Sequence, residues 1–354
     1  MVKLLLVAAI ALASCSLGTR QDSGSAENTY LNPVLDRDFP DPAVLKAPDG
    51  WFYAYATQSI SGSHAINIQV ARSRDLVQWA HLGEALPGKP VWAAGKQKFW
   101  APHVIHDREQ QRYLMYYSAE RSNAEGKCLA VATAEAPAGP FADSGEPLLC
   151  GEDIENIDPM AFDDPRTGKR LLYWGSGAKP IKVRELAPDR LSFMPGSTAT
   201  ELIFPDQRKE YQSLIEGAWI MFRGETYFLF YSGDRCCTRE PRYAIMVARS
   251  GNALGPFEHL SDAAREGSNA ILENSGFWLA PGHNSVVTDD EGVDWLLYHA
   301  VDPERRYFED LPRGKASPRV MLLDRIIYRD GWPRVDADRP SNTSRHRPAI
   351  GRGR

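Results

Sequence analysis

The chain has 354 residues, of which 43% are hydrophobic and 10% aromatic, and its formal net charge is −5. This length allows one to three domains, or a single ring of repeats that uses all of it. The small net charge argues against nucleic acid or an anionic membrane as a partner, so we expect a neutral or mildly polar substrate.

The first residues have the pattern of a secretion signal. A charged start at Lys3 precedes an apolar stretch, Leu4 to Leu12, that is too short to span a bilayer. The stretch ends in Leu12-Ala13-Ser14-Cys15, which resembles a bacterial lipobox and implies cleavage before Cys15 and lipid attachment to its sulfur. The alternative is an ordinary cleaved signal with an incidental cysteine. We expect residues 1–15 to be a lipoprotein signal, 16–28 a flexible tether, and the protein to be lipid-anchored at the bacterial cell envelope.

After the tether, the chain shows short β-branched and aromatic runs between turn residues and no sustained helical periodicity. The predicted strands fall into five successive groups. They are 51–57, 66–72 and 77–82; 104–106, 112–118 and 128–133; 159–162, 170–174 and 181–185; 218–222, 226–231 and 243–248; and 285–288, 295–299 and 319–323. This pattern predicts an all-β protein.

Five short motifs recur at near-even spacing along the same stretch. They are centred on Asp41, His103, Asp158, Glu216 and His283, at steps of 62, 55, 58 and 67 residues. Because four strands of a propeller blade occupy about 40 to 50 residues, this period predicts a five-bladed β-propeller with added loops. The heads of the innermost strands of such a ring meet at one central pocket. Three carboxylates would therefore gather there.

The propeller is expected to occupy residues 29–337. Residues 338–354 are rich in Pro, Ser and Arg, and we expect them to form a disordered, solvated tail.

Four cysteines follow the signal, and an even number in an exported chain permits disulfide bonds. Cys128 and Cys150 fall within one repeat and could join adjacent strands. Cys236 and Cys237 either bridge to each other or stay reduced. None of them has the spacing of a zinc site, and catalytic thiol chemistry is not expected.

The motifs, in their order, resemble glycoside hydrolase family 43 over about Asn32 to Val335. They are Asn32-Pro33-Val34-Leu35, Pro40-Asp41-Pro42, Ser73-Arg74-Asp75-Leu76, Trp100-Ala101-Pro102, Ile157-Asp158-Pro159, Ile215-Glu216-Gly217, Gly282-His283 and Gly331-Trp332-Pro333. The resemblance implies a five-bladed propeller and an inverting glycosidase. One position departs from the family pattern, because Ala218 stands where a proline is usual, and this affects the local turn more than the carboxylate.

By this resemblance Asp41 is the general base, Glu216 the general acid and Asp158 a helper. Inversion needs one carboxylate to activate water and a second, protonated carboxyl about 6.5–9.5 Å away to protonate the leaving oxygen. A neighbouring third carboxylate would raise the pKa of the acid by like-charge repulsion. Taken alone, Asp41 and Asp158 each precede a proline and would be turn residues.

Three further residues are expected to bind substrate. His283 matches a family histidine beneath the sugar, often beside a calcium ion held mainly through water; the alternative is a hydrogen-bonded core histidine. Arg319 matches a substrate-contacting arginine that would also favour ionised Asp41, or it forms a salt bridge on a strand surface. Trp100 would stack on the sugar, or it belongs to the core. No role is assigned to His103.

The substrate is expected to be an arabinose-containing plant polysaccharide. The family cleaves α-L-arabinofuranosyl and β-D-xylosyl bonds, and the Cys236-Cys237 turn followed by Tyr243–Ser250 resembles its arabinan-degrading branches. We therefore expect an α-L-arabinofuranosidase or an endo-arabinanase, acting as a monomer. A β-D-xylosidase is the alternative, although many of these add a β-sandwich domain that this length does not hold. An inactive glycan-binding propeller is the alternative from another class, and the presence of all three acids argues against it.

Overall fold

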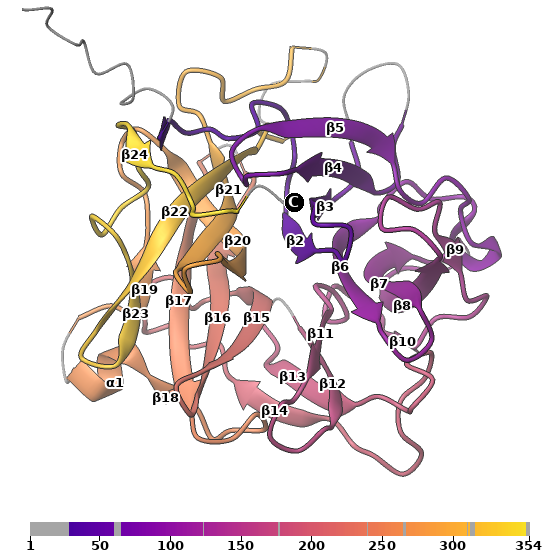
Figure 1. Cartoon of the computed structure of the whole chain (residues 1–354). Coiled ribbons are helices and arrows are strands. Elements are labelled where there is room, and N and C mark those ends of the chain that lie inside the picture. Colours follow the sequence, from indigo (N-terminus) through magenta and orange to yellow (C-terminus); the bar gives the residue numbers. More distant parts are fainter. Residues whose placement is uncertain are drawn as a thin grey trace, which may run out of the picture.

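The computed structural model describes residues 28–59, 65–122, 124–175, 178–238, 240–264, 267–309, 311 and 316–351. Over these residues the chain forms five antiparallel sheets around a central axis (Figure 1), which confirms the predicted five-bladed β-propeller. Its helical elements there are the one-turn α1 (Leu260–Ala264) and the 3₁₀ turn η1 (Val91–Ala93). Within the described ranges no helix is long and apolar enough to cross a membrane.

Each blade is one continuous piece of the chain. The first contains β2 (Ala43–Lys46), β3 (Phe52–Ala56), β4 (Gln69–Ser73) and β5 (Trp79–Glu84). The second contains β6 (Trp100–Asp107), β7 (Arg112–Glu120) and β8 (Lys127–Ala134), with β9 (Ala142–Asp143) and β10 (Leu149–Cys150) paired to β8. The third contains β11 (Met160–Asp163), β12 (Arg170–Trp174), β13 (Ile181–Glu185) and β14 (Thr200–Ile203).

The last two blades follow the same order. The fourth contains β15 (Ile215–Arg223), β16 (Thr226–Arg235) and β17 (Arg242–Ser250), with β18 (Glu258–His259) and β19 (Ala270–Leu272) paired to β17. The fifth contains β20 (Leu279–Thr288), β21 (Asp294–Val301), β22 (Val320–Arg329) and β23 (Trp332–Val335).

The first strand of every blade lies nearest the axis. Figure 1 shows β2, β6, β11, β15 and β20 around the centre, and each of them contacts the first strands of both neighbouring blades. Apolar side chains fill the spaces between blades in four clusters. Because a blade has both faces covered, a middle strand such as Phe52–Ala56 is buried at every position and reads as a continuous apolar run.

The heads of the inner strands share one backbone feature. A left-handed residue occurs there in all five blades: Asp41 (φ 57°), Ala101 (φ 46°), Asp158 (φ 58°), Gly217 (φ 64°) and His283 (φ 47°). The pairing register also shifts near the heads of β6, β15 and β20. Bulges of this kind re-aim side chains. The five sequence motifs are thus five copies of one backbone turn.

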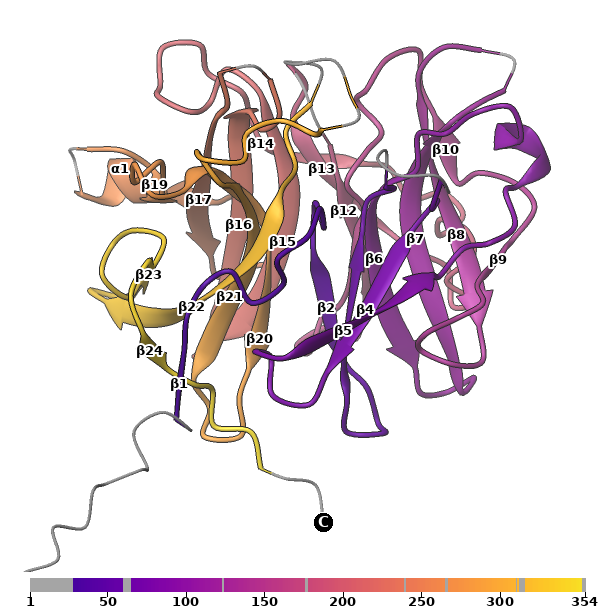
Figure 2. The ribbon, with the colours of Figure 1, turned by 90° about the horizontal axis from the view of Figure 1, so that it is seen from above.

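Both ends of the described chain pack at the end of the ring opposite to the heads of the inner strands. β1 (Thr29–Tyr30) pairs with β24 (Arg345–His346), as Figure 2 shows. Asn32 Nδ2 donates to Ser341 Oγ at 2.8 Å, and Arg347 Nη1 lies 3.1 Å from Asp75 Oδ2.

The expected disordered tail is therefore wrong for residues 338–351. Their polar side chains bond to the N-terminal segment and to the first blade, contacts that composition alone does not reveal. Residues 1–27 and 352–354 lie outside the described ranges, and with them the predicted lipoprotein signal and nearly all of the tether.

The four cysteines form two disulfides. Cys128–Cys150 joins the paired strands β8 and β10. Cys236–Cys237 lies in the turn between β16 and β17.

Candidate active site

A cavity of about 350 Å³ opens at the heads of the inner strands, and all six predicted site residues line it. They are Asp41, Trp100, Asp158, Glu216, His283 and Arg319. The remaining residues of its wall include Asp38, Thr57, Ile154, Ile157, Phe308 and the two residues of the Cys236–Cys237 disulfide. The repeat spacing thus predicted a real convergence of residues far apart in the chain.

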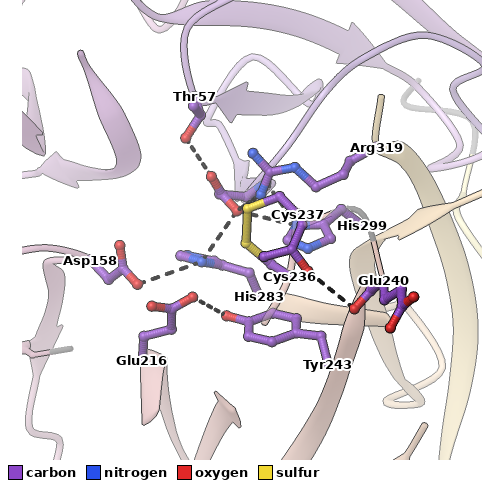
Figure 3. Close-up of a disulfide and its surroundings, with 12 residues drawn as sticks. Thr57, Asp158, Glu216, Cys236, Cys237, Glu240, Tyr243, His283, His299 and Arg319 are labelled. Atoms are coloured by element: carbon purple, nitrogen blue, oxygen red, sulfur yellow. Dashed lines mark hydrogen bonds and ion pairs between the residues drawn. A yellow bond between two sulfur atoms is a disulfide. The ribbon is translucent and has the colours of Figure 1, made fainter. Parts of the chain in front are cut away.

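Asp41 is fixed by three neighbours. Thr57 Oγ1 donates to its Oδ2 at 2.5 Å, and Arg319 Nη1 donates to its Oδ1 at 2.9 Å. His299 Nδ1 lies 3.2 Å from Oδ1, but it accepts the Asp41 N–H at 3.1 Å and so carries no proton to donate (Figure 3). Burial, followed by the Arg319 charge, lowers the pKa of His299 to about 4, which leaves the ring neutral. The charged partner of Asp41 is therefore Arg319.

The electrostatics keep Asp41 ionised. Burial is the largest single effect and raises its pKa, but the Arg319 guanidinium, together with His283 and His299, outweighs burial, and the pKa of Asp41 lies well below its ordinary value. A general base must be unprotonated at working pH. Asp41 meets this requirement.

Asp158 and Glu216 form the second half of the carboxylate set. Gly217 N–H donates to Asp158 Oδ2 at 3.0 Å, and Tyr243 Oη donates to Glu216 Oε1 at 2.7 Å. Burial, followed by the charges of Glu216 and Asp41, raises the pKa of Asp158 well above its ordinary value. The expected like-charge repulsion thus acts on Asp158. Two close carboxylates titrate as a unit, and the raised pKa of Asp158 favours a proton held on this pair, of the kind a general acid donates.

His283 lies between the two halves. Its Nδ1 is 3.5 Å from Asp41 Oδ1 and 3.7 Å from Asp158 Oδ2 (Figure 3). Gly217 packs under the ring, and a Cβ on Gly217 would come within 3.3 Å of it. Burial lowers the pKa of His283, while Asp41 acts in the opposite direction.

The predicted calcium ion needs ligands near His283. In the part of the chain that the structure describes, no group of three or more His, Cys, Asp or Glu side chains could hold a metal ion. The protein side chains alone therefore do not form a calcium site. A calcium held mainly through water stays a prediction, which activity with and without EDTA would test.

Trp100 is half-buried at the cavity wall rather than in the core. Lys127 Nζ sits over its ring, 3.3 Å from the centroid. Burial lowers the pKa of Lys127 to about 7. The indole is thus packed against a buried amine while it borders the cavity.

His103 does not belong to the cavity. Its Nδ1 accepts the Ala161 N–H at 3.2 Å, and its ring packs against Trp219 at a centroid distance of 5.2 Å. Burial lowers the pKa of His103 to about 3, so the ring is neutral. It links the second and third blades.

A repeated hydrogen bond ties the strand heads of four of the five blades to the preceding blade. The acceptor is a polar side chain at or just after the mouth end of that blade's second strand, and the donor is the N–H of the left-handed residue. The pairs are Thr57 Oγ1 with Ala101 N–H at 2.8 Å, Ser118 Oγ with Asp158 N–H at 3.1 Å, Ser232 Oγ with His283 N–H at 2.8 Å, and His299 Nδ1 with Asp41 N–H at 3.1 Å.

The fourth blade is the exception. The preceding second strand, β12, ends in Trp174 with Gly175 after it, and neither side chain is an acceptor. The N–H of Gly217 bonds to the Asp158 carboxylate instead. Asp158 therefore also positions the backbone next to Glu216.

The sequence did not single out Thr57, Tyr243 or His299. Their signal is faint: Thr57 follows the aromatic strand β3 and His299 lies near the end of β21. Which inner-strand atom they meet depends on registers and bulges that spacing does not encode.

A ring of β-blades whose axial cavity combines an ionised carboxylate with a proton-holding carboxylate pair has the site of a glycosidase that works by acid–base catalysis. The sequence model described as "Glycosyl hydrolases family 43" matches residues 30–333, and the chain belongs to this family of glycosidases. The predicted family resemblance is confirmed.

Known relatives span most of the chain. A probable arabinan endo-1,5-α-L-arabinosidase A of Aspergillus flavus is 28% identical over 83% of this chain and 90% of its own length. An extracellular exo-α-(1→5)-L-arabinofuranosidase of Cellvibrio japonicus is 25% identical over 84% of this chain and 86% of its own. The α-L-arabinanase of Cellvibrio cellulosa, solved with arabinohexaose, shares the fold at a TM-score of 0.68 and 21% identity, covering 85% of this chain and 96% of that one.

Proposed function

We propose that this glycosidase hydrolyses α-L-arabinofuranosyl linkages of arabinan with inversion of configuration. The observation that carries the proposal is the division of charge in one cavity, with Asp41 held ionised by Arg319 and a proton retained by Asp158 and Glu216. The names of the Aspergillus and Cellvibrio relatives support arabinan as the substrate.

In the proposed reaction Asp41 removes a proton from water, whose oxygen attacks the anomeric carbon. Glu216 gives its proton to the glycosidic oxygen as that bond breaks, so one carboxyl gains the proton that the other loses. Tyr243 holds the Glu216 carboxyl in place, and Asp158 positions Gly217 beside it. We assign substrate contacts to Trp100, His283 and Arg319, which border the same cavity.

The test is hydrolysis of an aryl α-L-arabinofuranoside, an aryl β-D-xyloside and debranched arabinan, side by side, with proton NMR of the first-formed sugar anomer. Turnover of the arabinofuranoside with an inverted product supports the proposal and exo action. Oligomers from debranched arabinan without aryl cleavage indicate an endo-arabinanase. Turnover of the xyloside alone would establish the β-xylosidase alternative.

Two variants separate the roles of the acids. Glu216→Gln should lose about 10²- to 10⁴-fold in rate on a poor leaving group and much less on a dinitrophenyl leaving group, which needs no protonation. Asp41→Asn should lower the rate equally for the poor and the dinitrophenyl leaving group, because activation of water does not depend on the leaving group. If both variants bind glycan like the wild type and the wild type never turns over, the inactive glycan-binding propeller replaces the enzyme.

We further propose that the protein is exported and anchored by a lipid on Cys15. The support is the lipobox-like Leu12-Ala13-Ser14-Cys15, two disulfides, which persist in oxidising compartments, and the word "extracellular" in the name of the Cellvibrio relative. Labelling of the full chain with a fatty acid in a bacterial host, compared with Cys15→Ser, tests the anchor. Equal labelling of both proteins would refute it.

A further inference from the structure

The two disulfides have different surroundings. Cys128 is fully buried and Cys150 half-buried, and their bridge joins two paired strands away from the residues that line the cavity. Cys236 and Cys237 are both half-exposed, and both border the cavity that holds the three carboxylates. Figure 3 shows this second bridge among Asp158, Glu216, His283 and Arg319. A bridge at this place contributes to the wall of the site as well as to the turn.

The base of the turn is independently fixed. The last pair of the β16–β17 ladder joins Arg235 to Arg242. Arg242 Nη1 lies 2.7 Å from Asp234 Oδ2, and Asp234 also accepts a hydrogen bond from the Ser213 N–H at 3.2 Å. The bridge between adjacent residues then closes a small ring at the tip, so the sulfurs sit on a rigid support.

The same hairpin holds two residues that act on the carboxylates. Ser232 on β16 accepts the His283 N–H, and Tyr243 on β17 donates to Glu216. The sulfurs are thus placed by the element that also positions the acid, so their location relative to the reacting bond is fixed.

The chemistry of the cavity calls for an apolar contact here. Its carboxylates and Arg319 offer hydrogen bonds to sugar hydroxyls, whereas a disulfide has little hydrogen-bonding capacity and presents two polarizable sulfurs. A sugar ring carries C–H surfaces as well as hydroxyls, and small-molecule sites combine apolar walls with a few polar groups. Phe308 and Ile154 add apolar surface to the lining of the same cavity.

We propose that the Cys236–Cys237 disulfide is an apolar contact surface for the sugar whose bond is cleaved, and that affinity for this sugar depends on the bridge. The proposal rests on the proposed function for the identity of the sugar. Reduction breaks the S–S bond and leaves two thiols. An added dithiol supplies the two electrons and two protons and becomes a disulfide; an added phosphine supplies the two electrons and becomes a phosphine oxide, and water supplies its oxygen and the two protons. The turn then loses the small ring that the Cys236–Cys237 bond closes, and the two sulfurs no longer form a rigid surface at the cavity.

The test compares the wild type with Cys236→Ala/Cys237→Ala on the aryl α-L-arabinofuranoside, or on whichever aryl glycoside the wild type hydrolyses. We expect KM to rise about five- to twentyfold, in the range that one lost apolar pocket contact produces, while kcat changes about twofold or less. An aryl glycoside of a single sugar is used because the proposed contact of the Cys236–Cys237 disulfide is with the sugar whose bond is cleaved, which lies at the carboxylates. An unchanged KM, or a fall in kcat alone, would overturn the proposal.

Reduction of the folded wild type provides a second measurement if the double variant folds poorly. A phosphine should raise KM to the value of the variant and leave the variant itself unaffected. Alkylation and mass spectrometry should then find label on Cys236 and Cys237 but not on Cys128. An equal response of wild type and variant to reduction would assign the effect to Cys128–Cys150 and overturn the proposal.

The two proposals fail in distinguishable ways. A wild type that hydrolyses none of the glycosides contradicts the proposed function. The wall is then tested by titrating arabinohexaose and following tryptophan fluorescence, where a five- to twentyfold weaker binding by the double variant supports it. Equal binding by the two proteins, or none by either, overturns it.

Discussion

Arg319 and Asp41 form a charge pair across 2.9 Å at the cavity mouth, with only 12% of either side chain exposed. The two residues are 278 positions apart in the chain, and the first and fifth blades bring them together. Because water is largely excluded from this pair, its effect on the protonation of Asp41 is large.

Replacing Arg319 should therefore shift the pH profile of the enzyme. Arg319→Ala removes the group that lowers the pKa of Asp41, so the pKa rises and the base becomes protonated at higher pH. We expect the acidic limb of kcat/KM to move to higher pH and kcat/KM at neutral pH to fall about 100-fold.

Two variants control this experiment. Arg319→Lys keeps a positive charge and should shift the acidic limb of kcat/KM less than Arg319→Ala does. Arg329→Ala removes an exposed ion pair with Asp338 and should leave the pH profile unchanged. An unmoved limb in Arg319→Ala would show that Asp41 is not the titrating base.

The hydrogen bonds that tie the strand heads to the preceding blades should contribute to turnover as well as to stability. Ser118→Ala and Ser232→Ala remove the acceptors for the Asp158 and His283 N–H groups, at a cost of about 1 kcal/mol of stability each. We expect kcat to fall several-fold as the strand heads relax. Ser250→Ala removes an equivalent bond to Asn252 at the far end of β17 and should cost stability alone. Equal activity in all three variants would contradict a positioning role.

Gly217 should tolerate no side chain. Gly217→Ala places a Cβ at φ 64° and 3.3 Å from the His283 ring. The control Gly224→Ala has a similar φ of 54° but open space around it. Both should lose about 1 kcal/mol of stability through left-handed strain, measured by urea unfolding. Only Gly217→Ala should also lower kcat/KM, because it displaces His283 between the carboxylates.

Asp158 should make the protein less stable as the pH rises. Its raised pKa means that the folded protein binds this proton more tightly than the unfolded chain. Ionisation of Asp158 lowers the free energy of unfolding, and this loss is absent below about pH 4, where Asp158 is protonated in both states, and grows as the pH rises above that value. Asp158→Asn should therefore raise Tm more at pH 7 than at pH 4, while turnover falls. Asp330→Asn, at an exposed residue with a similar φ of 53°, is the control, and equal Tm gains at both pH values would argue against the raised pKa.

The fold could be predicted because each blade repeats a local signal. Asp41, Asp158 and His283 occupy the same left-handed position, and a polar residue at that turn followed by an apolar strand is visible in the sequence. The convergence of the three acids could be predicted because the inner strands of a propeller ring all point to one axial pocket. Local sequence and repeat spacing were therefore sufficient to predict the fold and the meeting of the acids.

The partners of these residues could not be predicted in the same way. Whether Arg319 meets Asp41 or a surface acid depends on how β22 is placed against the first blade, which involves the whole ring. The order of residues 338–351 was missed for a similar reason, since Ser341 and Arg347 bond to segments about 300 residues away. Long-range pairing leaves little trace in composition.

The packing of the chain ends has a geometric consequence. β2 and β20 start at the cavity mouth and finish near the turn at Asp290, which receives Lys46 at 2.5 Å and the Gly351 N–H at 2.7 Å. The chain therefore enters and leaves the ring at its base, as Figure 2 shows. A protein held to a surface by residues ahead of Asn28 would stand on this base with its mouth turned outward. An insoluble polymer could then be trimmed from above without competing with the surface for space.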